Sequence, residues 1–154
     1  MEIKELKIRP EKYQNKKLIN GYDQFNHLLR LLRTKLLSDE IVISINNRID
    51  ELNLISVSEK ELRIQIRRTQ SSIIKLIEKK LNLVTKNHYR NTWLAVGMAA
   101  FGVPIGVVFG IALGNMGLLG IGLPIGMVIG IAVGSGLDKK AFEDGRQLDL
   151  EIKY

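Results

Sequence analysis

The sequence predicts a mainly α-helical membrane protein, with a basic helical domain in residues 1–90 followed by a transmembrane hairpin. Residues 91–137 contain no charged side chain over 47 positions, whereas residues 1–90 hold 19 Lys or Arg and 11 Asp or Glu, a net charge of +8. Residues 1–90 also carry apolar residues at helical spacing. A bilayer core takes roughly 20 apolar residues per helix, so residues 91–137 suffice for two spans and a turn.

The N-terminal domain is expected to contain three helices. Residues 22–37 form the first, because Phe25 and later leucines recur at intervals of three and four. The second runs from about residue 39 to residue 54, although the β-branched start at residues 41–43 leaves a strand open as an alternative. The third begins at Ser58, where Glu61 three residues later completes a capping box. The first helix's apolar stripe consists of Phe25, Leu28, Leu29, Leu32 and Leu36.

The third helix has a long apolar seam, and its length suggests that the helix continues unbroken to Trp93. Two packing modes fit this seam: an antiparallel bundle within one chain, or a parallel coiled coil between subunits, because the spacing is close to a heptad. The seam consists of Leu62, Ile66, Thr69, Ile73, Ile77, Leu81 and Val84.

The hairpin is expected to span residues 93–114 and 118–137, joined by residues 115–117. Residues 101–115 and 121–135 are two copies of one phrase, with nine identities in fifteen. Lys and Arg flank the pair on both outer sides, so the positive-inside rule places both termini on the cytoplasmic side of the membrane. Pro104 and Pro124 occupy matching places and are read as tolerated bends or as movable kinks.

Glycines recur every four residues in both copies, which lets helix backbones approach closely. If the two glycine faces meet each other, the hairpin can be a closed monomer; if one faces outward, it drives oligomerisation. The two series are Gly102, Gly106, Gly110 and Gly114, and Gly122, Gly126, Gly130 and Gly134.

Residues 138–154 form a cytoplasmic tail with four Lys or Arg and five Asp or Glu. Apolar and charged residues alternate over residues 147–154, which predicts a strand. We expect it to pair with residues 3–8.

The third helix also presents a basic and polar face that suits phosphate groups, because guanidinium groups bind phosphate through paired hydrogen bonds. The alternatives are an ordinary solvated helix face and the basic flank common beside membrane spans. The candidate ligand residues on this helix are Arg63, Arg67, Arg68, Ser71 and Lys75, with Gln70 and Ser72 alongside. Arg30 and Arg33 join them if the bundle brings them near.

We expect neither an enzyme nor a metal or cofactor site. His27 and His88 lack partners at metal-ligand spacing, cysteine is absent, and no catalytic or nucleotide-binding fingerprint occurs, so no catalytic residue is assigned. Residues 1–18 carry charges throughout, so no secretory signal is expected.

The segment from residue 89 to residue 148 resembles the C-terminal glycine-zipper hairpin of small bacterial membrane proteins. A small basic domain ahead of such a hairpin is similar to membrane effectors of anti-phage defence systems, in particular the Hailong effectors. The resemblance implies a homo-oligomer, with a tetramer as one candidate, that forms an ion channel in response to an oligonucleotide or cyclic nucleotide made by a partner nucleotidyltransferase. No ligand-contact residue carries over. The rival expectation is a static anchor that holds a protein partner at the membrane.

Overall fold

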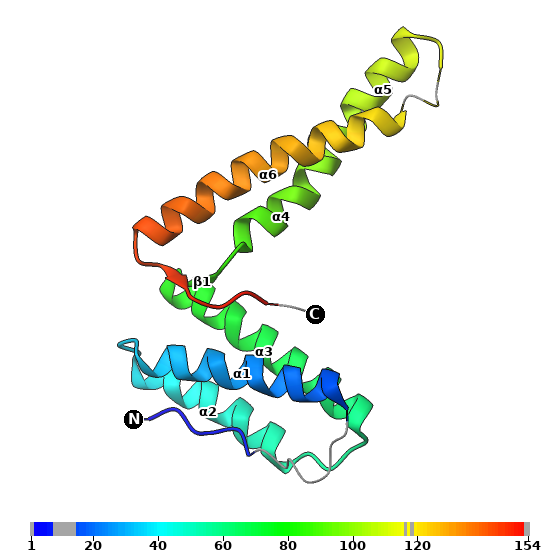
Figure 1. Ribbon diagram of the computed structural model, residues 1–154. Coiled ribbons are helices and arrows are strands. Elements are labelled where there is room, and N and C mark those ends of the chain that lie inside the picture. Colours follow the sequence, from blue (N-terminus) through cyan, green and yellow to red (C-terminus); the bar gives the residue numbers. More distant parts are fainter. Residues whose placement is uncertain (1, 8–14, 116, 118, 153–154) are drawn as a thin grey trace. The chain divides into compact units, whose positions relative to one another are not determined.

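The computed structural model describes residues 2–7, 15–115, 117 and 119–152, and these residues are mainly helical, as predicted (Figure 1). The chain divides into two compact units. One comprises Met1–Leu83 with Leu148–Tyr154, and the other comprises Val84–Gln147. Each unit is described by itself.

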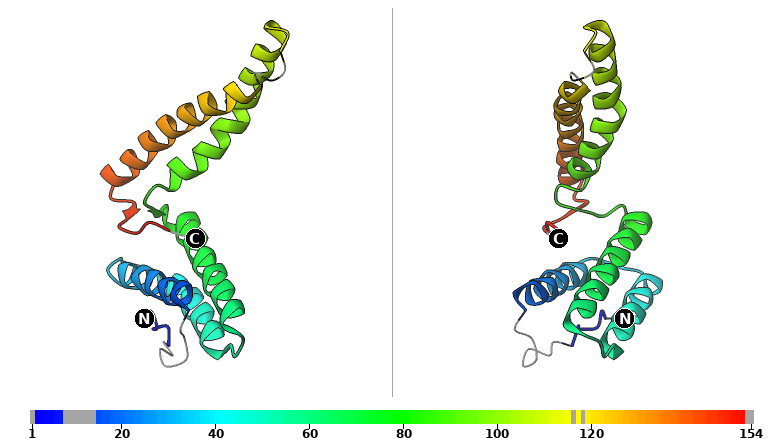
Figure 2. Two further views of the ribbon diagram at one scale, coloured as in Figure 1. Left: turned by 45° about the vertical axis from the view of Figure 1, so that its right-hand side comes forward. Right: turned by 90° about the vertical axis from the view of Figure 1, so that its right-hand side faces the viewer.

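The first unit contains helices α1 (Lys16–Arg33), α2 (Asp39–Leu54) and α3 (Glu59–Leu81). α1 and α2 run in opposite directions, and α3 packs against both (Figures 1 and 2). The seam of α3 is therefore buried within one chain, as the bundle alternative predicted. Ser58 caps α3 as expected, because its hydroxyl accepts the backbone N–H of Glu61 at 3.4 Å.

The second helix is confirmed, and its strand alternative at residues 41–43 is ruled out because α2 is helical from Asp39 onward. The predicted bounds of the first helix are wrong. The first helix begins six residues earlier than predicted, because Asn15 caps it there by accepting the N–H of Lys17. It ends at Arg33. Leu36 therefore lies outside the helix and is fully exposed instead of belonging to the apolar stripe.

The apolar stripes of the three helices meet in one hydrophobic core. The fully buried side chains at its centre come from all three helices, so each helix depends on the other two for burial of its apolar face. They include Leu18, Phe25, Leu28 and Leu32 of α1, Ile45 and Ile49 of α2, and Ile66, Ile73 and Ile77 of α3.

The predicted continuous helix from Ser58 to Trp93 is also wrong. α3 ends at Leu81, and Asn82 takes a left-handed conformation with φ 54° that stops the helix. A short strand β1 (Val84–Thr85) follows, and Asn87 is left-handed as well. Two asparagines, which tolerate positive φ better than most residues, thus separate α3 from the next helix.

The second unit is a helical hairpin. Its first arm consists of α4 (His88–Gly97), a π-helical turn η2 (Met98–Gly102) and α5 (Val103–Ala112), and its second arm is α6 (Leu119–Glu143). All three elements of the first arm contact α6. Both arms, His88–Ala112 and Leu119–Glu143, are long and apolar enough to cross a membrane. α6 passes the predicted end at residue 137, and Met116 and Leu118 of the predicted turn and span lie outside the described residues.

The C-terminal strand pairs differently from the prediction. β2 (Gln147–Leu148) pairs with β1, and the N–H of Val84 donates to the carbonyl of Arg146 at 3.0 Å. The strand stops early because the N–H of Leu150 bonds back to the carbonyl of Leu148 at 2.8 Å, which turns the chain. Leu148 and Leu150 are buried in the core of the first unit. Ile8 and Tyr154, at the ends of the two predicted strands, lie outside the described residues.

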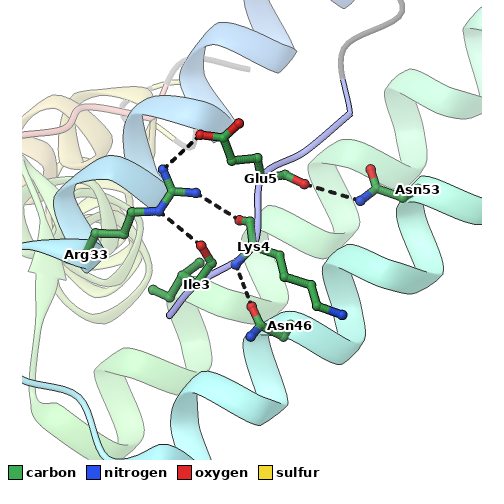
Figure 3. Close-up of polar contacts among 6 residues, drawn as sticks. All are labelled: Ile3, Lys4, Glu5, Arg33, Asn46 and Asn53. Atoms are coloured by element: carbon green, nitrogen blue, oxygen red, sulfur yellow. Dashed lines mark hydrogen bonds and ion pairs between the residues drawn. The ribbon is translucent and has the colours of Figure 1, made fainter. Parts of the chain in front are cut away.

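Residues 2–7 form no strand and instead lie as an extended strap across α1 and α2 (Figure 3). Ile3 and Leu6 enter the core, and two asparagines of α2 bind the strap's backbone. The two asparagines are seven residues apart, about 10.5 Å along the helix, which matches three residues of extended chain. Their four bonds are Lys4 N to Asn46 Oδ1 (2.8 Å), Asn46 Nδ2 to Glu2 O (3.0 Å), Lys7 N to Asn53 Oδ1 (2.9 Å) and Asn53 Nδ2 to Glu5 O (3.3 Å).

The buried amide of Asn46 should hold the strap in place. Asn46→Ala removes two hydrogen bonds and leaves the N–H of Lys4 and the carbonyl of Glu2 without this partner, at a cost of about 2 kcal/mol in the free energy of unfolding. We expect limited proteolysis to cut residues 2–7 faster in this variant. Asn47→Ala changes an exposed neighbour, and equal cleavage of the two variants would show that Asn46 does not hold the strap.

Candidate functional site

A cleft between α1 and α3 forms a basic concavity on the first unit, with a volume of about 630 Å³. Three cations line it against one carboxylate, so its electrostatic potential favours anions. The lining residues are Lys17, Asn20, Gly21, Asp23 and Gln24 of α1 and Arg63, Arg67 and Gln70 of α3.

The second concavity, of about 440 Å³, lies along α3 and shares Arg67 with the α1–α3 cleft. It is lined by Arg67, Arg68, Ser71, Ser72 and Lys75. Arg48 of α2 adds a further cation beside it, because its Nε donates to the hydroxyl of Ser72 at 3.0 Å. Arg67 therefore belongs to both concavities, and a phosphate-bearing ligand in either one would meet its guanidinium group.

The candidate residues of α3 lie together in the structure, whereas the candidate residues of α1 lie outside both concavities. Arg30 and Arg33 line a different cavity, with Glu5 and Leu6 of the strap. Arg33 holds the strap: its Nε donates to the carbonyl of Ile3 and its Nη2 to that of Lys4, both at 3.1 Å (Figure 3). A third contact, at 3.5 Å, joins Arg33 to the carboxylate of Glu5.

Gln70 is the least expected member of the α1–α3 cleft. Its position in the sequence places it beside the basic face, yet only 2% of the residue is exposed. Gln24 of α1 donates from Nε2 to the Oε1 of Gln70 at 3.2 Å. The Nε2 of Gln70 and the Nε of Arg63 are buried without a hydrogen-bond partner among the described residues. Lys17, Gln24 and Arg48 were not predicted as site residues, because their approach to α3 depends on how the helices pack.

The backbones of the two arms of the hairpin approach each other closely at a series of glycines. A Cβ atom added to any of the four regularly spaced glycines of α6 would lie less than 3.0 Å from backbone atoms of the first arm. On Gly126, for example, it would lie 2.5 Å from the N of Gly102 and from the O of Gly97. The inward glycines of α6 are Gly122, Gly126, Gly130 and Gly134, and Gly102 and Gly106 face them from the first arm.

The two remaining glycines of the predicted series differ in burial. Gly110 is buried in α5, whereas Gly114 is exposed and has φ +63° beyond the end of that helix. Gly97 joins the inward face although it is five residues from Gly102. It does so because η2 closes a π-type bond from the N–H of Val103 to the carbonyl of Met98, which adds one residue to that turn. The π turn ends two residues before Pro104.

A buried carboxylate fixes the base of the hairpin. Asp138 of α6 is 7% exposed and accepts the backbone N–H groups of Tyr89 at 3.1 Å and Arg90 at 2.9 Å. These groups belong to the first turn of α4, where N–H donors lack partners within the helix and negative charge is favoured. Nearby, the guanidinium of Arg146 donates hydrogen bonds to Asp144 and then to Tyr89, which raise the pKa of Arg146 above its usual value.

Asp138→Ala should loosen this base. The change leaves two first-turn N–H groups of α4 without acceptors, which costs about 1–3 kcal/mol in the free energy of unfolding. We expect faster hydrogen exchange at the amides of Tyr89 and Arg90 in detergent micelles. Glu143→Ala, an exposed change on the same helix, is the control; unchanged exchange in Asp138→Ala would contradict the capping role.

Comparisons with protein families, with curated proteins and with solved structures find no match to this chain.

Proposed function

We propose that this protein is a homo-oligomeric effector of the bacterial inner membrane. Its helical unit binds a nucleotide or oligonucleotide signal, and its hairpins form or open a pore that disrupts the membrane during anti-phage defence. The observation that carries this proposal is the joining, in one chain, of two features: a basic cleft with two buried donors that have no partner in the described part of the chain, and a hairpin with an apolar outer surface.

The ligand side of the proposal is supported by charge and by chemistry. The α1–α3 cleft is lined by three cations and one carboxylate, and further cations line the second concavity. Guanidinium groups bind phosphate oxygens through short, charge-assisted hydrogen bonds. The shared position of Arg67 makes it the residue on which binding would depend most.

The membrane side is supported by what the hairpin leaves outside. With the glycines turned inward, large apolar side chains cover the outer surface, including Val108, Ile111 and Val128 at 65%, 70% and 67% exposure. A contiguous apolar surface of this kind is unfavourable in water and favourable in lipid. Helices packed through glycine are typical of membrane proteins, where van der Waals contact drives association.

The coupling between the two units would run through paired strands and not through one long helix. β1 follows α3 directly, and β2 leads from the hairpin to Leu148 and Leu150 in the core of the helical unit. A ligand that shifts α3 would therefore act on both connections to the hairpin. The ligand must bind one arrangement of the bundle more tightly than the other for such a shift to occur.

A second candidate function, a non-conducting membrane anchor for a protein partner, is favoured by one observation. The glycine faces of the two arms meet each other within one chain, so they are not left over for contacts between subunits. Oligomerisation would then depend on the outer apolar surface or on the helical unit.

Leakage from liposomes separates the two functions. We would reconstitute the purified protein in dye-loaded liposomes and add cyclic nucleotides and short oligonucleotides one at a time. The effector predicts dye release with at least one of these compounds. Tight liposomes under every compound, with the protein shown to be inserted, would contradict the effector and favour the anchor.

A further inference from the structure

Two buried donors of the α1–α3 cleft favour ligands that carry hydrogen-bond acceptors. The Nε2 of Gln70 and the Nε of Arg63 are both buried, and neither has a hydrogen-bond partner among the described residues. Buried donors are paired in the great majority of native structures, and an unpaired donor costs about 1–3 kcal/mol. The two residues lie seven positions apart on α3, so they share a face of the helix. The cleft is therefore built to receive hydrogen-bond acceptors.

Gln24 acts as a positioning residue for Gln70. Its Nε2 donates to the Oε1 of Gln70 at 3.2 Å, so this oxygen already has a partner. The Nε2 of Gln70 is therefore the group that can donate to a ligand. A neutral amide donor suits a carbonyl oxygen or a ring nitrogen, whereas the charged groups of Lys17, Arg63 and Arg67 suit a phosphate. The volume of about 630 Å³ lies within the range of small-molecule sites.

We propose that the α1–α3 cleft binds one nucleotide unit, with its phosphate at Lys17, Arg63 and Arg67 and an acceptor atom of its base at the Nε2 of Gln70. This inference rests on the proposed function, from which the phosphate-bearing class of ligand is taken. Gln70 is then the residue that distinguishes a nucleotide from a sugar phosphate.

Calorimetry on the full-length protein in lipid nanodiscs tests the assignment. The probes are the 5′-monophosphates of adenosine, guanosine, cytidine and uridine, with ribose 5-phosphate as the ligand that lacks a base. We expect at least one nucleotide to bind about 10-fold more tightly than ribose 5-phosphate. In Gln70→Met that advantage should vanish while ribose 5-phosphate binding stays unchanged. Arg63→Met should weaken both kinds of ligand.

The stability of the unliganded protein separates a ligand role from a structural one. Methionine removes the unpaired donor but also the acceptor of the bond from Gln24, so Gln70→Met should melt no lower than Gln24→Met, which loses the same bond and keeps the unpaired donor. A structural Gln70 predicts a lower melting temperature. Should the methionine variant fail to fold, Gln70→Glu keeps the shape and replaces the donor with a carboxylate. Its charge weakens both ligands, so the readout is the ratio of the two affinities, which should fall from about 10 to about 1.

Two results would overturn the inference: no nucleotide binding more tightly than ribose 5-phosphate, or a Gln70 change that weakens both ligands equally. Neither depends on leakage. Nucleotide binding without dye release would contradict the effector function and leave the cleft assignment standing. Ligand-evoked release that is unchanged by Gln70→Met and Gln70→Glu would contradict the cleft assignment and leave the effector function standing.

Discussion

Gly126→Ala is expected to destabilise the hairpin, although alanine favours a helix more than glycine does. The added Cβ would lie 2.5 Å from backbone atoms of Gly97 and Gly102, and backbone cannot move aside as a flexible side chain can. We expect a loss of about 1–3 kcal/mol in the free energy of unfolding, and a larger loss for Gly126→Leu. The measurement is unfolding of the purified protein in mixed micelles, followed by circular dichroism.

Gly136→Ala is the matched control for this prediction. It lies on the same helix, but a Cβ at this position would meet nothing within 4 Å. The substitution should therefore be neutral or stabilising by up to about 1 kcal/mol, the difference in helix propensity. Opposite signs at the two positions would establish that the glycine face holds the arms together. Equal effects would show that the close backbone approach does not contribute to stability.

Arg67→Glu should abolish the response to ligand. Arg67 lines both concavities of the helical unit, so the substitution removes a phosphate partner from each and adds a repelling carboxylate. We expect affinity for the active oligonucleotide or nucleotide to fall at least about 100-fold, or ~3 kcal/mol, and ligand-evoked dye release to disappear. Binding is measured by calorimetry and release with dye-loaded liposomes.

Lys60→Glu makes the same change of charge on the same helix, outside both concavities. It should bind ligand and release dye almost as the wild type does, apart from a small long-range effect that salt screens. If Arg67→Glu and Lys60→Glu behaved alike, the cations of α3 would be acting through net charge, and the site would lose its support.

The helices of this protein could be predicted because their apolar spacing and caps are local features. Ser58 with Glu61 marks the start of α3 in the sequence, and the structure confirms that cap. The end of α3 was missed because Asn82 carries no strong stop signal: asparagine tolerates a left-handed conformation but does not require it.

The details of the site depend on contacts between distant residues, which periodicity does not encode. Gly97 reaches the inner face only because a π turn adds a residue before Gly102. Gln70 looks like part of a solvated face until α1 covers it. The strap offers the same lesson, because Asn46 binds a backbone more than forty positions away.

Conductance across a planar lipid bilayer tests the central claim most directly. The full-length protein would be inserted, and the compound that releases dye from liposomes would then be added on the side of the helical unit, first to the wild type and then to Arg67→Glu. The account predicts discrete current steps that follow ligand addition in the wild type and are absent in the variant. The account would be contradicted if no current steps occurred with ligand bound, or if the same steps occurred without ligand and in Arg67→Glu.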